Sequence, residues 1–113
     1  MDSQDKAARA AAVQEALAFL GESTGWQALV ELAYGEWVLA RFQMRIEEAE
    51  AEEGLLTVLG DVKEFGEALL YSEANLPLSQ TGAYEITIIG EEMRLASDDG
   101  MRLRVTRLGS PQA

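Results

Sequence analysis

The stretch 36–46 alternates between apolar and polar residues, and this pattern limits the possible fold more than any other feature of the chain. Its alternate apolar positions are Val38, Ala40, Phe42, Met44 and Ile46. A repeat of two is typical of a half-buried strand, whereas an amphipathic helix repeats its apolar residues every three or four positions. We therefore predict a strand over residues 36–46.

The alternative for this region is a helix that continues to Gly54, because Ala, Glu, Arg, Leu and Met all favour helices. Such a helix would carry its acidic residues at its C-terminal end, where the helix dipole disfavours negative charge. Residues 24–34 are equally open. Trp26, Leu29, Val30 and Ala33 fit a short helix that Thr24 could cap. The choice between helix and strand stays open over residues 24–53, with a strand favoured for 36–46.

An acidic run follows the alternating stretch. Residues 47–53 read EEAEAEE and contain no cation; the carboxylates are Glu47, Glu48, Glu50, Glu52 and Glu53. The short apolar segment 55–59, between Gly54 and Gly60, fits a strand that returns antiparallel to the first. The acidic run is then expected at the extended tip of a hairpin.

Two further helices and three further strands complete the prediction. Residues 5–20 are rich in alanine and repeat apolar residues at helical spacing. Residues 61–74 begin with a capping-box-like pair, Asp61 and Glu64, and Leu76-Pro77 would end that helix. Residues 83–89, 92–97 and 101–108 show strand alternation, and Asp98-Asp99-Gly100 is a typical hairpin turn.

The expected fold is therefore α+β, with an antiparallel sheet of about five strands and two or three helices packed on one face. We expect one domain over residues 1–113, of which 109–113 form a frayed tail. The aromatic residues Trp26, Tyr34 and Trp37 are expected in the core.

The composition excludes several kinds of chemistry. The chain has a formal charge of −11 and contains neither cysteine nor histidine. Disulfides, thiolate nucleophiles and the commonest general base are therefore ruled out. The acidic run also lacks the Asp/Asn-Gly spacing of a calcium loop. We predict a protein that is not an enzyme and uses no metal or cofactor. No apolar run approaches the length of a membrane span, so we expect a cytoplasmic protein.

The charge distribution suggests a protein partner. We predict that Glu47, Glu48, Glu50, Glu52 and Glu53 contact a protein with a basic surface, without direct binding of nucleic acid. Simple solvation of a surface loop is the default interpretation of such a run, and the protein contact is the functional alternative to it. Arg94, Arg102, Arg104 and Arg107 suggest anion binding, but solvated sheet arginines that pair with the acidic zone over residues 47–92 are the favoured interpretation.

Two other functional classes share this size and charge. One is a nucleic-acid-mimicking inhibitor of the phage anti-CRISPR or nuclease-inhibitor type. The other is a chaperone like those of type III secretion, which would form a homodimer and hold a partner in extended form.

One segment resembles a known family. It comprises Asp61-Val62-Lys63-Glu64-Phe65, Leu69-Leu70 and Leu76-Pro77-Leu78-Ser79. This segment is similar to the Val-x-Asp, Phe-Asn, Leu and Leu-Pro-Leu-Ser pattern of the YjfI family, small uncharacterised proteins encoded beside a PspA-type membrane-stress protein. The glycine-aromatic segment that follows in that family is not matched by residues 81–84. The resemblance implies a cytoplasmic α+β accessory protein, and it transfers no site residues.

Overall fold

The computed structural model describes residues 2–52, 54–63 and 69–109, in which one helix precedes seven strands. The elements are α1 (Asp2–Glu22), β1 (Gln27–Tyr34), β2 (Trp37–Glu52), β3 (Leu55–Lys63), β4 (Leu69–Pro77), β5 (Tyr84–Ile89), β6 (Glu92–Ser97) and β7 (Met101–Gly109).

The strands form one antiparallel sheet in the order β4-β3-β2-β1-β7-β6-β5. Four consecutive strands, β1 to β4, make one half of the sheet, and β5 to β7 make the other. The two halves meet where β1 pairs with β7, for example Val30 with Val105. The edge strands β4 and β5 are consecutive in the chain and are connected by residues 78–83.

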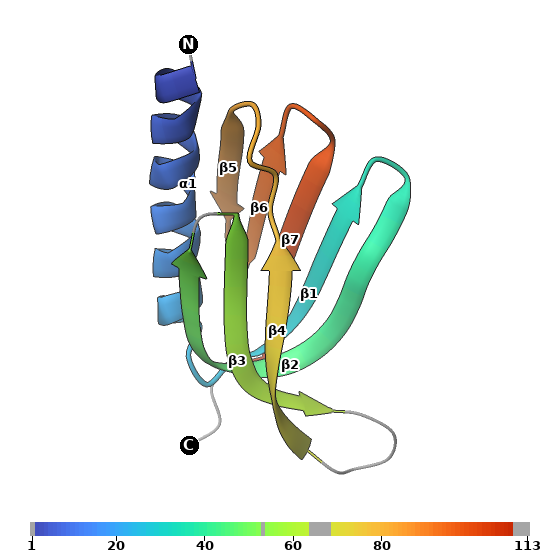
Figure 1. Cartoon of the computed structure of the whole chain (residues 1–113). Coiled ribbons are helices and arrows are strands. Elements are labelled where there is room, and N and C mark those ends of the chain that lie inside the picture. Colours follow the sequence, from blue (N-terminus) through green and yellow to red (C-terminus); the bar gives the residue numbers. More distant parts are fainter. Residues whose placement is uncertain (1, 53, 64–68, 110–113) are drawn as a thin grey trace.

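The sheet folds over on itself because its longest strand bends. β2 carries a bulge between Ile46 and Glu48, opposite Gly60 of β3, and Figure 1 shows its C-terminal part turning back beside α1. A β-carbon on Gly60 would lie 1.9 Å from the carbonyl oxygen of Arg45. Only glycine permits this close approach of two backbones, so Gly60 is a requirement of the bend.

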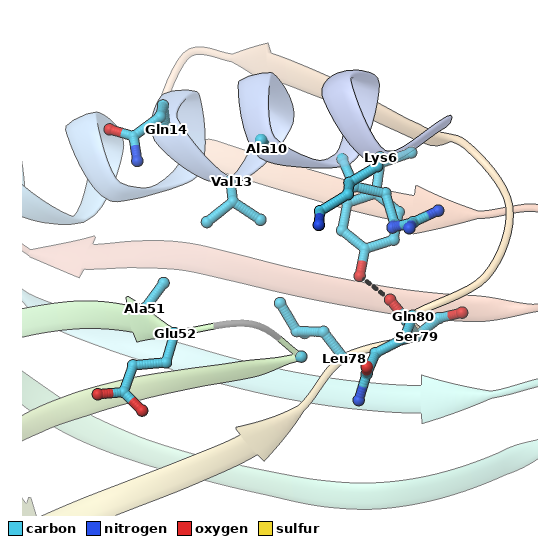
Figure 2. A pocket seen from close by; sticks show the side chains of 12 residues that line it. Lys6, Ala10, Val13, Gln14, Ala51, Glu52, Leu78, Ser79 and Gln80 are labelled. Atoms are coloured by element: carbon cyan, nitrogen blue, oxygen red, sulfur yellow. Dashed lines mark hydrogen bonds between the residues drawn. The ribbon is translucent and has the colours of Figure 1, made fainter. Parts of the chain in front are cut away.

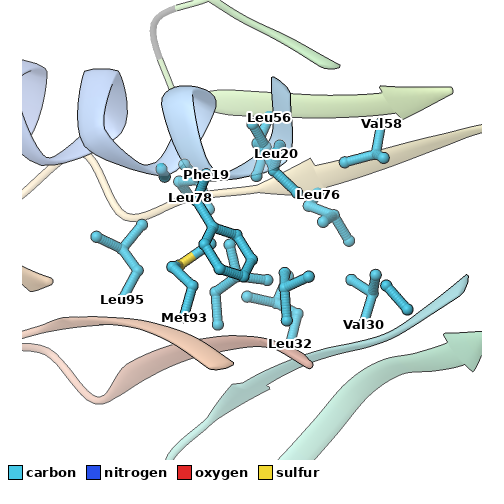
Figure 3. Close-up of a cluster of buried hydrophobic side chains, with 14 of the residues drawn as sticks. Phe19, Leu20, Val30, Leu32, Leu56, Val58, Leu76, Leu78, Met93 and Leu95 are labelled. Carbon is cyan, nitrogen blue, oxygen red and sulfur yellow. The ribbon is translucent and has the colours of Figure 1, made fainter. Parts of the chain in front are cut away.

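The core lies between the two layers of the folded sheet and α1. Leu56, Val58 and Leu76 from β3 and β4 face Val30 and Leu32 of β1 across this space (Figure 3). All five side chains are at most 2% exposed. The helix closes one side with residues at helical spacing: Ala12, Ala16, Phe19 and Leu20. In β7, for example, buried residues on the inner face alternate with exposed or half-buried residues on the outer face.

The expected proportion of helix and strand was wrong. The structure has one helix and seven strands in its described residues, whereas we expected about five strands with two or three helices. Residues 27–34 form β1, with Ala28, Val30 and Leu32 buried on one face, so the helical interpretation of 24–34 is incorrect. The predicted helix over 61–74 is also incorrect. Asp61 and Val62 belong to β3, and residues 69–74 belong to β4; 64–68 lie outside the described residues.

Other predictions are confirmed. The helix expected over 5–20 is α1, and the strands expected over 83–89, 92–97 and 101–108 are β5, β6 and β7. The strand predicted from alternation over 36–46 forms the first part of β2, which then continues through the acidic run to Glu52. The hairpin tip is therefore shorter than expected, and the run is mostly strand. β7 extends to Gly109, and residues 110–113 of the expected tail lie outside the described residues.

Candidate functional site

The acidic run lies on the second half of β2, where strand geometry separates its members. Glu48, Glu50 and Glu52 are exposed, and they alternate with the half-buried Ala49 and Ala51. Because successive side chains of a strand point to opposite faces, the three carboxylates share the outer face of the sheet. Among the described residues, no hydrogen bond or ion pair joins these three carboxylates to a partner.

The remaining two members of the run are placed differently. Glu47 occupies the bulge and accepts a hydrogen bond from Arg45 Nε at 3.0 Å. Arg45 also pairs with Asp61 through its Nη2. Glu47 therefore belongs to a local ion-pair cluster at the bend, and it is separate from the file of three carboxylates. Glu53 lies outside the described residues.

The register of the sheet places a fourth carboxylate on the same face as Glu48, Glu50 and Glu52. Glu48 is paired with Leu59 of β3, which is paired in turn with Glu73 of β4. Glu73 is exposed and shares the outer face with Glu48. We call Glu48, Glu50, Glu52 and Glu73 the carboxylate face. No pattern in the sequence distinguishes Glu73, because residues 61–74 match a helix and only the strand register brings Glu73 to this face.

The surface between these carboxylates is partly apolar. Leu55 is paired with Glu52 and Leu59 with Glu48, and both leucines are half-buried. Between them, Thr57 donates a hydrogen bond from Oγ1 to Asn75 Oδ1 at 3.0 Å. The carboxylate face thus combines fixed negative charge with aliphatic surface. This combination suits lysine and arginine side chains, which have long apolar stems and charged ends.

Arginines gather on another part of the outer face. Glu31 of β1 is paired with Arg41 and Arg104 on its two sides, and Arg104 is paired with Arg94 of β6. The Glu31 carboxylate contacts Arg41 Nε at 3.5 Å and Arg104 Nη2 at 3.3 Å. Arg94 pairs with Glu92. These arginines are solvated and paired. The partner of Arg94, Glu92, belongs to the acidic zone over residues 47–92, as expected, whereas Arg104 pairs with Glu31 outside that zone.

Arg107 is close to these arginines in the sequence, but it lies on another part of the structure. Its side chain is only 13% exposed and faces the C-terminal end of α1.

Trp37 does not lie where the sequence predicts: it is 76% exposed at the β1–β2 hairpin, next to the exposed Val38 and Leu39. The prediction that Trp37 lies in the core was wrong, because Trp37 begins β2 at the β1–β2 turn, just beyond the register shift at Leu32 and Ala33, where its side chain is exposed.

The described residues contain neither a metal-binding cluster nor a helix that could cross a membrane. No three acidic side chains among them converge closely enough to hold a metal ion. No helix in this part of the chain combines the length and apolar character that crossing a bilayer requires. No family model, curated protein or solved structure matches the chain.

Proposed function

We propose that this chain is a non-enzymatic, cytoplasmic protein-binding protein that engages a basic partner surface through its carboxylate face. The observation that carries the proposal is the file of Glu48, Glu50 and Glu52 on the outer face of β2, where all three are exposed and have no partner among the described residues. Unpaired charges of one sign steer a partner of opposite charge and raise the rate of association.

The backbone under these carboxylates is held in place on both sides of the bend. β2 pairs with β1 before the bulge and with β3 after it, and Ile46 also exchanges backbone hydrogen bonds with Gly25 and Trp26. Groups on a fixed strand lose less conformational freedom on binding than groups on a loop. This favours the protein-contact function over simple solvation of a mobile hairpin tip.

Charge spacing favours a protein partner over imitation of DNA. Successive carboxylates of one strand face are about 6.8 Å apart, twice the rise of a strand residue. A DNA strand carries one negative charge per about 3.4 Å of axis. The file of three therefore has about half the axial charge density of one DNA strand. A nucleic-acid groove is a less suitable partner than a small basic patch with room for two or three contacts.

The test compares two variants of equal net charge. One carries Glu48→Gln, Glu50→Gln and Glu52→Gln; the control carries Glu15→Gln, Glu36→Gln and Glu85→Gln, which remove three exposed carboxylates elsewhere. Partners are captured from the native host with the unmodified chain and identified by mass spectrometry. The affinity of each purified partner is then measured for all three proteins at two salt concentrations.

We expect the first variant to bind at least tenfold more weakly and to lose most of the salt dependence, while the control binds normally. If both variants lost affinity for the partner equally, the loss would follow from net charge alone and would contradict a defined binding site. Competition by duplex DNA would instead support the nucleic-acid-mimicking inhibitor. Binding of an extended apolar segment by a homodimer, unaffected by either variant, would support the secretion-type chaperone.

A further inference from the structure

A pocket of about 290 Å³ lies between the N-terminal half of α1 and the opposite rim of the folded sheet. Its helical wall includes Lys6, Arg9 and Val13, which recur at helical spacing on one face of α1. Its other wall includes Ala51 and Leu78, from the end of β2 and the segment after β4. Figure 2 shows Val13 and Leu78 facing the space between these walls. The volume is close to the lower limit of ordinary ligand pockets.

Small residues keep this space open. Ala10 and Ala51 line it from opposite sides, and Gly54 lies at the turn between β2 and β3. A β-carbon on Gly54 would meet the side chain of Gln80, with its Nε2 at 2.5 Å. The Gln80 side chain therefore rests directly over the Gly54 backbone. Larger side chains at these positions would have filled the gap between helix and sheet, as Phe19 and Leu20 do further along α1.

The charges that line the pocket are mostly positive. Lys6 and Arg9 are two of the nine cations in a chain with twenty acidic residues. Arg9 Nη1 donates a hydrogen bond to the carbonyl oxygen of Gly82 at 2.6 Å, which fixes the position of the guanidinium group. Glu52 also borders the pocket. However, its side chain points away from α1 in Figure 2, as its place on the outer face requires.

Asp98 and Asp99, which lie near the segment after β4, accept hydrogen bonds from that segment and from β7. Asp99 accepts hydrogen bonds from Ser79 Oγ at 2.5 Å and from the Met101 amide at 3.3 Å. Asp98 accepts one from the Ala83 amide at 3.3 Å. The hydroxyl of Tyr84, another lining residue, donates to the Ser79 carbonyl oxygen. These bonds hold the segment after β4 in place and leave an apolar space bounded by Lys6 and Arg9.

We propose that this pocket binds a small amphipathic monocarboxylate, with its carboxylate against Lys6 and Arg9 and its short aliphatic chain between Val13, Ala51 and Leu78. An arginine fork is well suited to a planar carboxylate and forms charge-assisted hydrogen bonds with it. The apolar walls supply binding through burial of the chain. A second carboxylate at the far end of the ligand would be desolvated among apolar side chains, so dicarboxylates are excluded. Glu52 borders both this pocket and the carboxylate face, but the ligand contacts proposed here involve Lys6, Arg9 and the apolar walls and not the carboxylates of that face.

The probes are hexanoate, its uncharged analogue hexanamide, its dicarboxylate analogue adipate, and acetate. Binding is measured by calorimetry and by amide chemical shifts of the full chain. We expect saturable binding of hexanoate, with the largest shifts in residues 6–14 and 78–84, and binding at least tenfold weaker for the other three probes. Equal binding of hexanamide would overturn the role of the cations, and shifts centred elsewhere would overturn the site.

Two variants test the walls of the pocket separately. Arg9→Gln should weaken hexanoate binding about tenfold, the size of one charge-assisted hydrogen bond, while Arg94→Gln on the outer face should leave it unchanged. Ala51→Leu fills the pocket and should abolish binding, while Ala11→Leu, on the exposed side of α1, should not. Unchanged binding to a folded Ala51→Leu protein would refute the proposal. The shift map of the unmodified chain decides the location even if one variant fails to fold.

Discussion

The Arg107 guanidinium lies over the ring of Phe19, with its central carbon 4.3 Å from the ring centroid. Arg107 Nε also donates a hydrogen bond to Ser23 Oγ at 2.7 Å, and the Ser23 hydroxyl donates to the Phe19 carbonyl oxygen at 2.6 Å. Ser23 is fully buried. The end of β7 is thus fastened to the C-terminal end of α1, where a positive charge is also favoured by the helix dipole.

Replacement of Arg107 by methionine should therefore destabilise the fold. The variant Arg107→Met keeps most of the side-chain volume but loses the hydrogen bond to Ser23 and the contact of the cation with Phe19. We expect a loss of about 2–3 kcal/mol in the free energy of unfolding, measured with urea. The control Arg94→Met removes the same charge from a side chain that is 65% exposed, and it should change stability by less than about 0.5 kcal/mol. Equal effects would contradict the structural role of Arg107.

The bend of β2 should depend on Gly60. In Gly60→Ala, the new methyl group would collide with the backbone of Arg45, so either the bulge or the pairing of β2 with β3 must shift. We expect a loss of about 3 kcal/mol, at the upper end of ordinary overpacking.

Gly21 provides the matched comparison for Gly60. It lies near the end of α1, and a β-carbon there would meet no atom within 4 Å. Gly21→Ala should stabilise the protein by about 0.5–1 kcal/mol because alanine favours the helix. If thermal unfolding showed the two alanine variants to be equally stable, the close approach at Gly60 would not exist in solution.

Asp99 should make stability depend on pH in the acidic range. Hydrogen bonds from Ser79 and Ser97 hold the pKa of Asp99 below its usual value. A carboxylate with a lowered pKa in the folded state stabilises the fold above its unfolded pKa of about 3.9, and this contribution is lost as the pH falls through the folded pKa. Asp99→Asn should therefore be less stable than the unmodified chain at pH 7, and the difference should shrink below about pH 4. Urea midpoints between pH 7 and pH 3 provide the measurement, and a difference that stays constant would argue against this role.

The exposed Trp37 should contribute little to stability. We expect Trp37→Thr to change the free energy of unfolding by less than about 0.5 kcal/mol, because the side chain is 76% exposed and threonine retains a preference for strands. Leu32→Ala, in the core, should cost about 2–5 kcal/mol. Chemical denaturation of both variants compares them directly. A large loss at Trp37 would mean that the β1–β2 hairpin packs against another surface.

The strands were predictable where one face is clearly polar. In β7, Met101, Leu103 and Val105 alternate with Arg102 and Arg104, and the burial of the strand follows this alternation. β1 has the same alternation of buried residues, but Leu29 lies on the outer face, so the alternation is not visible in the sequence. β1 is the central strand of the sheet, with neighbours on both sides, and Leu29 is half-buried on its outer face. The choice between helix and strand for 24–34 stayed open because of that ambiguity.

The local signals at Asp61 were overridden by long-range pairing. The capping pattern at Asp61 favours the start of a helix. In the structure, however, Asp61 pairs with Tyr71 across the β3–β4 ladder and forms an ion pair with Arg45. A capping box contributes about 1 kcal/mol, which a ladder of paired residues easily exceeds. The carboxylate face was only partly predictable for the same reason. The acidic run is visible in the sequence, but the division into outward and bulge positions, and the addition of Glu73, follow from strand register.

The order of the strands also determines which strand pairs form early and which form late during folding. All neighbours in the sheet except β1 and β7 are connected by hairpins, which close quickly because their strands are adjacent in the chain. The β1–β7 pair joins residues from opposite ends of the described strands, such as Ala28 with Arg107. Its formation carries the entropy cost of closing the long loop that runs from β1 to β7. If the two halves of the sheet form first and then dock at this pair, the pairing of β1 with β7 is the slow step of folding. A permuted chain that begins near residue 80 and links the two natural ends should therefore fold faster than the natural chain.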